Sequence, residues 1–263
     1  MHTGSDAEIV VDGDVVTKLH RFGTDPRALA VRLRIARHLG GPDGCLLAPR
    51  HPEPQAVDGP TGRRWCTRWP RVEVVSAHPV GLPWAEAARV LARLHLAETT
   101  AVIPHGAGAR TDRALRRMPA TAPSVISRAA ATLSDRARQP GSAGRPRTLV
   151  HGDFHLGQLG RTADGRWRLI DVDDLGVGDP AWDLARPAGF WAAGLIPDED
   201  WATFLTAYRD AGGPAVPAAG DPWPTLEPLA RAAVVQAAAA GTRSARDETQ
   251  AELVAACARM VEG

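Results

Sequence analysis

The chain has 263 residues, of which 44% are hydrophobic and 23% charged, and its formal net charge is +1 at pH 7. These values predict an ordinary globular protein, and the near-zero charge argues against nucleic acid or an anionic membrane as a partner. No stretch approaches the ~20 consecutive apolar residues that span a bilayer. The three cysteines are far apart and form neither a zinc motif nor a disulfide framework, so we expect thiols in a reducing cytoplasm.

The basic residues are divided very unevenly between the two types. Of the 31 basic residues, 30 are Arg, and the only Lys is Lys18. Arg is a planar, delocalised cation whereas Lys is a compact point charge, so the two are not interchangeable where geometry matters. We therefore treat Lys18 as a candidate functional residue at a position where Arg would not serve.

Residues 1–78 are predicted to form a small, β-rich lobe with one helix. Two β-rich runs around Asp12-Gly13 indicate a hairpin, with Lys18 on its second strand. A helix is expected from Pro26 to a Gly-Gly-Pro stop. The remainder of this region is assigned as a surface loop at 49–62, a strand at 64–75 that is broken or confined to a sheet edge by its proline, and a linker at 78–83.

Residues 79–263 are predicted to form a larger, mostly helical lobe, so we place the domain boundary near residue 78. Apolar residues recur at helical spacing in several segments, and a polar connection separates the first two. The expected helices are 83–98, 122–138, 180–193, 198–211, 221–240 and 245–261. Together the two lobes predict an α+β protein.

The residues with the greatest chemical potential lie between residues 149 and 184. Short apolar runs alternate there with polar loops, and Asp164-Gly165 marks a hairpin turn between two of the runs. Five of the carboxylates in this stretch, together with two histidines, are the candidates: Asp153, Asp171, Asp173, Asp179, Asp183, His151 and His155. Carboxylates at the ends of short strands are held rigidly, which suits a site for cations and phosphates.

Phosphoryl transfer needs few parts, and this sequence offers a candidate for each. A positive group must hold the phosphates, a metal ion must be bound by hard oxygen donors, and a carboxylate must orient or deprotonate the acceptor hydroxyl. Lys18 is the candidate for the phosphates. Asp171 and the amide oxygen of Gln158 are candidates for Mg²⁺, and Asp153 is the candidate base.

The motifs that carry these candidates resemble those of one family. His151-Gly-Asp-Phe-His-Leu-Gly-Gln158, Ile170-Asp171 and Gly178-Asp-Pro-Ala-Trp-Asp183 are similar to motifs of the aminoglycoside phosphotransferase and choline kinase family, which has the bilobal protein-kinase-like fold. The resemblance covers roughly residues 8–210. It implies that Asp153 is the catalytic base, that Gln158 and Asp171 bind the metal, and that Lys18 grips the nucleotide phosphates. It also implies that His151 and Asp183 brace the catalytic loop.

Three features depart from the family pattern. Gln158 stands where the family usually has Asn, a form similar to that of bacterial maltokinases, which suggests a sugar-like acceptor. The Arg-rich helix after Lys18 lacks the glutamate that normally pairs with this lysine. We expect either that another carboxylate, with Glu53 and Glu73 as candidates, takes that part or that the lysine relies on the nucleotide itself. A minimal Asp-Gly-Asp turn replaces the family's Gly-rich phosphate loop.

We therefore predict an ATP-dependent (or GTP-dependent), Mg²⁺-requiring phosphotransferase acting on a hydroxyl of a small molecule. Residues 1–78 would bind the nucleotide, and residues 79–263 would carry the catalytic loop and bind the acceptor. The acceptor would be an aminoglycoside or another antibiotic, as in antibiotic resistance, or a sugar-like metabolite. A polycationic acceptor would need an acidic pocket, which Asp173, Asp174 and the Asp198–Asp200 turn could supply. We expect a monomer or homodimer.

The sequence leaves three alternative functions open. A pseudokinase that binds nucleotide without transferring phosphate would account for the missing helix glutamate, although Asp153 and Asp171 are both present. A kinase-like enzyme acting on peptide Ser or Thr in natural-product biosynthesis would use the same chemistry. A two-metal phosphoesterase would explain the clustered Asp and His residues but would need further ligands and would not need Lys18.

Overall fold

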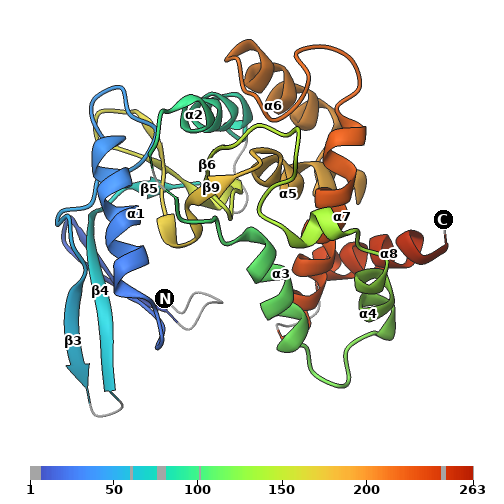
Figure 1. Cartoon of the computed structure of the whole chain (residues 1–263), viewed down its shortest axis with the longest axis horizontal. Helices are drawn as coiled ribbons and strands as arrows, with labels where there is room; N and C mark the ends of the chain where they lie inside the picture. The colour runs from blue at the N-terminus through green and yellow to red at the C-terminus, as the bar shows by residue number, and fades with distance from the viewer. Residues whose placement is uncertain (1–6, 60–61, 76–80, 101, 244–246, 263) are drawn as a thin grey trace. The chain divides into compact units, whose positions relative to one another are not determined.

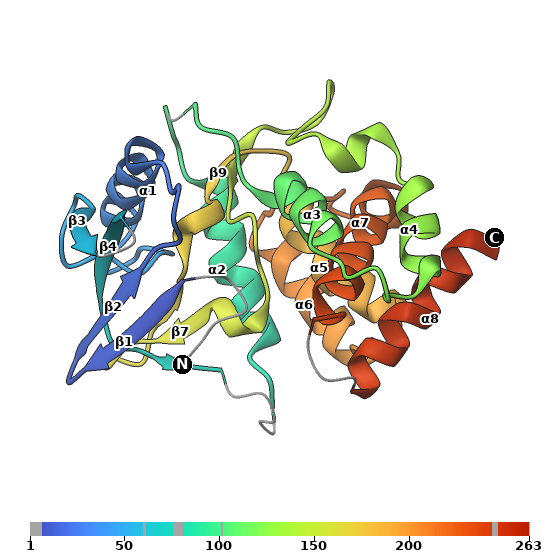
Figure 2. The ribbon, with the colours of Figure 1, turned by 90° about the horizontal axis from the view of Figure 1, so that it is seen from below.

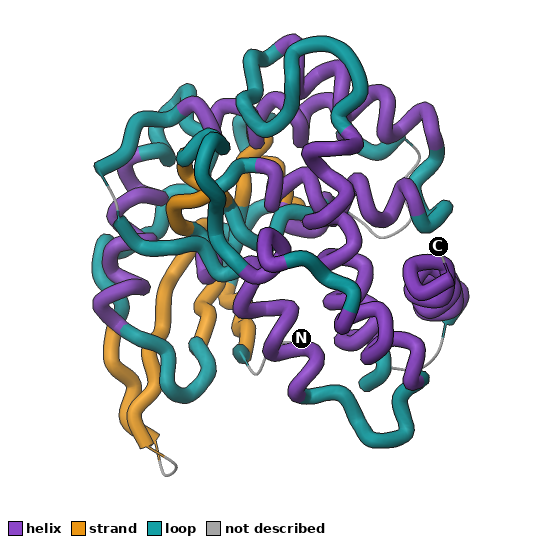
Figure 3. Tube along the Cα trace, turned by 45° about the vertical axis from the view of Figure 1, so that its right-hand side comes forward, coloured by secondary structure: helices purple, strands orange, loops and turns teal. Residues whose placement is uncertain are grey.

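The computed structural model describes residues 7–59, 62–75, 81–100, 102–243 and 247–262 (Figure 1). The chain divides into two compact units, which consist of residues 1–81 with 156–173 and of residues 82–155 with 174–263. Strands gather mainly in the first unit and helices in the second, as Figure 3 shows, so the α+β class predicted from sequence is confirmed. The predicted boundary near residue 78 and the first half of the predicted linker lie outside the described residues.

The first unit contains a four-stranded antiparallel sheet in the order β1-β2-β4-β3. The strands are β1 (Glu8–Asp12), β2 (Val15–Leu19), β3 (Gln55–Gly59) and β4 (Gly62–Pro70). The predicted hairpin is confirmed, and Gly13 turns it with a φ of 57° that most other residues would not adopt readily. Lys18 pairs with Ile9 on one side and Thr67 on the other, so it is central in this sheet.

The prediction of a surface loop at 49–62 is wrong for the part of this segment that forms β3. Its residues Gln55–Gly59 form an edge strand against β4, and Asp58 accepts a hydrogen bond from Arg63 across the hairpin at 2.8 Å. Most side chains of β3 are exposed, so the sequence shows no alternation of apolar and polar residues there. Its strand structure comes from main-chain pairing with β4, and local propensity does not reveal it.

The helix α1 (Pro26–His38) forms as predicted and lies beside β4 in Figure 1. Asp25 caps it by accepting a hydrogen bond from the Arg27 amide, and Leu29, Leu33 and Ala36 are buried. A second sheet of three strands joins residues 156–173 to this unit. It consists of β5 (Glu73–Val74), β7 (Leu159–Arg161) and β8 (Trp167–Leu169), in the order β5-β7-β8.

The second unit is mostly helical. Its helices are α2 (Trp84–Leu96), α3 (Ala107–Arg116), α4 (Ser124–Ala131), α5 (Ala181–Ala192), α6 (Asp198–Asp210), α7 (Trp223–Gly241) and α8 (Glu248–Glu262). Figure 2 shows α8 beside α4 and α7. The short strands β6 (Thr148–Val150) and β9 (Gly176–Gly178) pair antiparallel and frame the loop that carries Asp153.

Two predictions in this unit need correction. The segment 99–121, assigned as a polar connection, contains α3, a short helix rich in charged residues that buries only Thr111 and Ala114. The helix expected over 122–138 is broken: α4 ends at Ala131, and a short 3-10 helix follows at Asp135–Arg138. At the break the Thr132 hydroxyl donates to the Ala129 carbonyl, an interaction that satisfies a terminal carbonyl of α4.

The core of the second unit explains how its loops are fixed. Helices α5 and α7 approach so closely at Gly189 that an added Cβ would lie 2.7 Å from the carbonyl oxygen of Ala230. Trp182 and Trp201 are also buried. Within the described residues, no helix is long and apolar enough to cross a membrane.

Candidate active site

The β7–β8 hairpin brings together the two residues predicted to bind a metal ion. Leu159 pairs with Leu169, and the Ile170 amide donates to the Gln158 carbonyl at 2.9 Å. Gln158 therefore precedes β7 at the end of the hairpin where Asp171 follows β8. The turn at the other end contains Gly165, as the Asp-Gly signal predicts.

Asp171 adopts an uncommon backbone conformation. Its φ is 59°, and it is the only residue other than glycine with a positive φ among those the structure describes. Asp tolerates this region better than most residues, yet a non-glycine side chain there still carries strain of about 1–3 kcal/mol. Such outliers cluster at functional sites, which is consistent with a role for Asp171.

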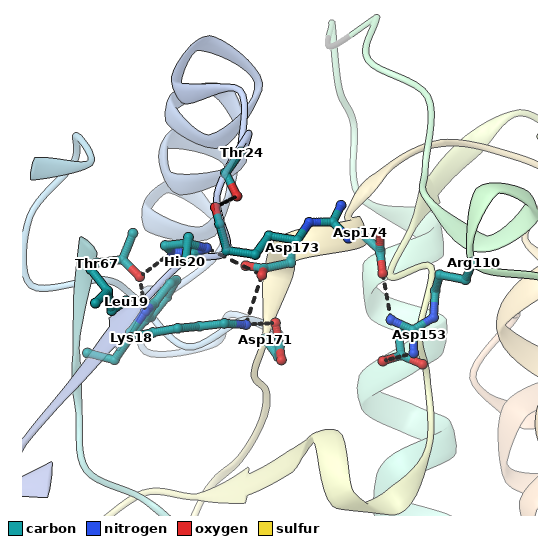
Figure 4. A network of polar contacts seen from close by, with 12 residues as sticks. Lys18, Leu19, His20, Thr24, Thr67, Arg110, Asp153, Asp171, Asp173 and Asp174 are labelled. Atoms are coloured by element: carbon teal, nitrogen blue, oxygen red, sulfur yellow. Dashed lines mark hydrogen bonds and ion pairs between the residues drawn. The ribbon is translucent and has the colours of Figure 1, made fainter. Parts of the chain in front are cut away.

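Lys18 lies against Asp171, the residue predicted to bind the metal with Gln158. Its Nζ atom is 2.6 Å from Oδ1 of Asp171 and 2.9 Å from Oδ2 of Asp173, as Figure 4 shows. Only 7% of the Lys18 residue surface is exposed. Burial by itself would lower the pKa of Lys18, but the charges of Asp173 and Asp171 outweigh it and raise that pKa. Lys18 is therefore a buried, fully charged ammonium group.

Another carboxylate does pair with Lys18, as expected, but it is neither of the two glutamates named as candidates. Glu53 pairs with Arg34 at 2.9 Å, and Glu73 is exposed on β5. Asp173, two residues after Asp171, holds the lysine instead. No local pattern in the sequence links it to a strand so far away in the chain.

A chain of hydrogen bonds extends from Asp173 into the four-stranded sheet (Figure 4). Nδ1 of His20 is 3.4 Å from Oδ2 of Asp173, and Nε2 of His20 is 2.9 Å from the Thr67 hydroxyl. The Trp69 indole also donates to that hydroxyl at 2.9 Å. The Thr67 hydroxyl therefore bridges Nε2 of His20 and the Trp69 indole, and the other ring nitrogen of His20, Nδ1, faces Asp173. Trp69 is buried in the sheet and takes part in this network through its indole.

The loop that carries Asp153 is braced by the buried carboxylate of Asp183, as predicted. The amides of His151 and Gly152 donate to it at 2.6 and 2.8 Å, and His95 donates from Nε2 at 3.0 Å. Burial would raise the pKa of Asp183, but the hydrogen bond from His95 and nearby charges outweigh it and lower that pKa. Asp183 therefore stays ionised and fixes the loop.

Two neighbours of Asp153 in the sequence complete this support. Phe154 is buried and stacks on Phe204 of α6, with ring centroids 5.8 Å apart. Gly152 has a φ of 84°, and an added Cβ would clash with the backbone of Asp174. The Asp153 side chain is therefore presented by a loop that cannot shift easily.

Asp153 itself is ion-paired. Oδ2 is 2.9 Å from Arg110 of α3, and Oδ1 is 3.7 Å from Arg186 of α5. Burial raises the pKa of Asp153, although both arginines act against this shift. A raised pKa suits a carboxylate that must accept a proton near neutral pH.

The sequence did not single out Arg110 or Arg186. Arg110 lies in the segment that was assigned as a connection, so its helix was not recognised. Arg186 stands three residues after Asp183, and one helical turn places it on the same side of α5. That spacing is the one signal that could have pointed to it.

Three of the carboxylates suggested for a cationic acceptor have other partners. Asp173 binds Lys18, Asp174 is 2.8 Å from Arg110, and Asp198 accepts a hydrogen bond from the Trp191 indole at 2.7 Å. Asp179 is likewise paired, with Arg145 at 2.9 Å. The predicted acidic pocket is not supported by these contacts.

The donor groups at Gln158 and Asp171 fit a magnesium ion that is shared with a substrate. The described residues contain no group of three or more His, Cys, Asp or Glu side chains that could hold a metal alone. Mg²⁺ commonly uses only one or two protein oxygens and takes its other ligands from phosphates and water. An amide oxygen and a half-exposed carboxylate match that requirement.

Comparisons with known proteins agree on the fold. A family model described as the phosphotransferase enzyme family matches residues 9–229. Among solved structures, a choline/ethanolamine kinase family protein from Mesorhizobium loti has a TM-score of 0.60 and 17% identity over 97% of this chain and 83% of its own. A thermostable mutant of aminoglycoside phosphotransferase APH(4)-Ia has a TM-score of 0.60 and 14% identity over 98% and 94%. Spectinomycin phosphotransferase APH(9)-Ia, in complex with ADP and spectinomycin, has a TM-score of 0.57 and 14% identity over 100% and 90%.

A comparison with curated proteins gave no match. The family match and the fold shared with these structures define a phosphotransferase enzyme with the protein-kinase-like fold. The chain belongs to the phosphotransferase enzyme family, and the resemblance seen in its motifs is confirmed.

Proposed function

We propose that the protein transfers the terminal phosphoryl group of ATP, bound with Mg²⁺, to a hydroxyl of a small molecule. The observation that carries this proposal is the contact of Lys18 with Asp171. A buried cation that could hold phosphates and a carboxylate that could hold a metal lie side by side. A metal-bound triphosphate needs this alternation of charge, whereas hydrolysis of a phosphoester would not need the lysine.

Lys18, Gln158 and Asp171 would bind the nucleotide phosphates and the metal. Lys18 is charged and partly dehydrated, so it would attract phosphate oxygens more strongly than a solvated lysine would. Gln158 and Asp171 would supply two oxygen ligands from the same end of the β7–β8 hairpin. The metal, when bound, would neutralise phosphate charge and orient the terminal phosphoryl group.

Asp153 would act on the acceptor. Its carboxylate has a pKa raised by burial and stands on a loop braced through Asp183, so it is suited to take the proton of an attacking hydroxyl. It precedes Gln158 by five residues, which links the acceptor-binding and metal-binding parts through a short loop. Hydrogen bonding and orientation by a positioned carboxylate are what the protein must contribute to this chemistry.

ATP is the donor we favour over GTP. The adenine nucleotide in the spectinomycin phosphotransferase complex supports this choice. The contact of Asp173 with Lys18 supports an active phosphotransferase over a pseudokinase, because it supplies the carboxylate that helix α1 lacks. A peptide acceptor would use the same residues for phosphoryl transfer. It would differ from a small-molecule acceptor in the groups that bind near Asp153.

The cellular location and the oligomeric state of the protein stay predictions. All three cysteines are buried thiols outside any disulfide, as a reducing cytoplasm would allow. A monomer or a homodimer is expected, and the acceptor is a hydroxylated antibiotic or metabolite.

A thermal-shift titration tests the nucleotide and metal part of the proposal. A ligand that binds only the folded state raises its stability by RT ln(1 + [L]/Kd). ATP with Mg²⁺ should raise the melting temperature more than ATP with EDTA. The Asp171→Ala variant should lose the metal-dependent part of the shift, while Asp164→Ala, an exposed turn carboxylate, should keep it. An unchanged metal-dependent shift in Asp171→Ala would refute the metal assignment.

A further inference from the structure

The surroundings of Asp153 carry more positive than negative charge. Arg110 bridges Asp153 and Asp174, with N–O distances of 2.9 and 2.8 Å (Figure 4). Arg113, one turn further along α3, lies 3.9 Å from Asp174, and Arg186 lies 3.7 Å from Asp153. These five side chains comprise three guanidinium groups and two carboxylates. Their formal sum is one positive charge.

The arrangement is restrained on both helices. The Gly106 amide donates to the Asp174 carbonyl at 2.9 Å, which fixes the start of α3 against the loop that contains Asp174. On α5, the guanidinium group of Arg186 lies over the Phe190 ring, 5.1 Å from its centroid. The arginines are therefore held near Asp153 by packing as well as by charge.

The positive charges around Asp153 also act on a neighbouring histidine. Burial, followed by the charges of Arg186, His151 and Arg110, lowers the pKa of His155 to about 2. A proton on this imidazole is thus disfavoured partly by the arginines around Asp153. An ammonium group of a bound acceptor would meet the same repulsion.

The other acidic residues of this unit near the catalytic loop do not offset the excess of positive charge around Asp153. Asp179 is held by Arg145 and Arg136, at 2.9 and 3.2 Å. Asp183 is occupied by His95 and by the amides of the loop. Neither carboxylate is available to receive a cationic group of an acceptor.

The pairing of Arg110 with Asp153 also bears on catalysis. A carboxylate that accepts hydrogen bonds from a guanidinium group is stabilised in its charged form, so it is a weaker base. Asp153 becomes more basic if Arg110 is drawn to another anion. A ligand that supplies this anion would bind and activate the base in one event.

We propose that the acceptor is a hydroxylated organic anion whose carboxylate, sulfate or phosphate group binds Arg110 and its neighbours Arg113 and Arg186. Guanidinium groups suit this task because they bind such groups through paired hydrogen bonds. The inference rests on the proposed phosphotransfer to a hydroxyl and specifies the charge class of the acceptor. Polycationic aminoglycosides and amino alcohols are correspondingly poor acceptors.

The first test sorts acceptors by charge without knowing their identity. A polar metabolite extract is separated by ion exchange at neutral pH into anionic, neutral and cationic fractions, and each is incubated with the protein, Mg²⁺ and ATP labelled at the terminal phosphate. Transfer of label by the anionic fraction is the expected result. Transfer by the neutral or cationic fraction alone would overturn the inference and leave the phosphotransferase function intact. No transfer by any fraction, or by the whole extract, would contradict the function and the inference together.

The second test uses variants of α3 and the active anionic acceptor. Arg110→Gln should raise the KM for that acceptor at least about tenfold, as loss of a charge-assisted contact implies, and leave the KM for ATP within about twofold. Arg110→Lys should restore part of the loss, since it keeps the charge but not the paired geometry. Arg116→Gln, an exposed change on the same helix, is the matched control. An unchanged acceptor KM in Arg110→Gln would overturn the inference.

Discussion

The ammonium group of Lys18 lies 2.9 Å from the carboxylate of Asp173, two residues beyond the predicted metal ligand Asp171. Helix α1 contains no acidic residue, so it offers no carboxylate for this lysine. Asp173 therefore supplies the second negative charge that holds Lys18 and is itself fixed by His20. The lysine and the metal-binding segment are consequently held as one unit.

Removal of the charge on Asp173 should weaken the binding of ATP. In Asp173→Asn, Lys18 would keep only Asp171 as an anionic partner, and its ammonium group would be less well fixed. We expect the KM for ATP to rise about tenfold, which corresponds to about 1.4 kcal/mol. Steady-state kinetics measures this, with Asp58→Asn, which breaks an exposed ion pair, as the control. An unchanged KM for ATP would show that Asp173 does not position the lysine.

Replacement of Lys18 by Arg should be costly although the charge is kept. The buried space between Asp171 and Asp173 accommodates a compact ammonium group, and a planar guanidinium group would displace one of the carboxylates. We expect at least a tenfold loss in kcat/KM for ATP, about 1.4 kcal/mol or more. The control is the reverse type of change at an exposed position, Arg34→Lys. Full activity in Lys18→Arg would mean that the single lysine of this chain is an accident of composition.

Removal of the proposed base should affect turnover far more than nucleotide binding. Asp153→Asn should lower kcat by about 10²–10⁴-fold, the usual contribution of a general base, while the KM for ATP changes little. Because burial raises the pKa of Asp153, the fall in wild-type kcat on acidification should begin above the pH at which an ordinary aspartate titrates. Asp164→Asn should behave as wild type. Comparable kcat values in Asp153→Asn and wild type would rule out the role of base.

The buried Asp183 makes a prediction about stability and pH. Its pKa is lowered in the folded state, so the protein gains stability from its ionised form above the pKa of the unfolded chain, about 3.9. This contribution is lost as the pH falls through that value toward the lower folded pKa. Asp183→Asn should therefore be less stable at neutral pH, by roughly 2–4 kcal/mol, and should lose less stability on acidification. Urea unfolding at several pH values measures both effects. The exposed change Glu199→Gln is the control, and equal acid sensitivity of Asp183→Asn and wild type would contradict the account.

Local patterns in the sequence were sufficient for the elements that depend on local chemistry. The two predicted hairpins follow from their Asp-Gly dipeptides, because the positive φ of Gly13 and of Gly165 is set within each turn. The edge strand β3 and helix α3 were missed because each buries few of its own side chains, and because β3 is held by pairing with β4 and α3 by packing on α7. The contacts of the candidate site are also distant in sequence: Lys18 and Asp171 are 153 residues apart, and Arg110 and Asp174 are 64 apart. Such partners emerge only from the fold.

The most direct test of the central claim is the chemical fate of the terminal phosphate of ATP. The protein is incubated with Mg²⁺, ATP and the active acceptor fraction, and the products are followed by phosphorus NMR and by ADP formation. We predict one phosphomonoester for each ADP formed, with no such product from Asp153→Asn. Release of inorganic phosphate from a phosphoester in the absence of ATP, with no phosphomonoester formed in its presence, would contradict the assignment as a phosphotransferase acting through Asp153.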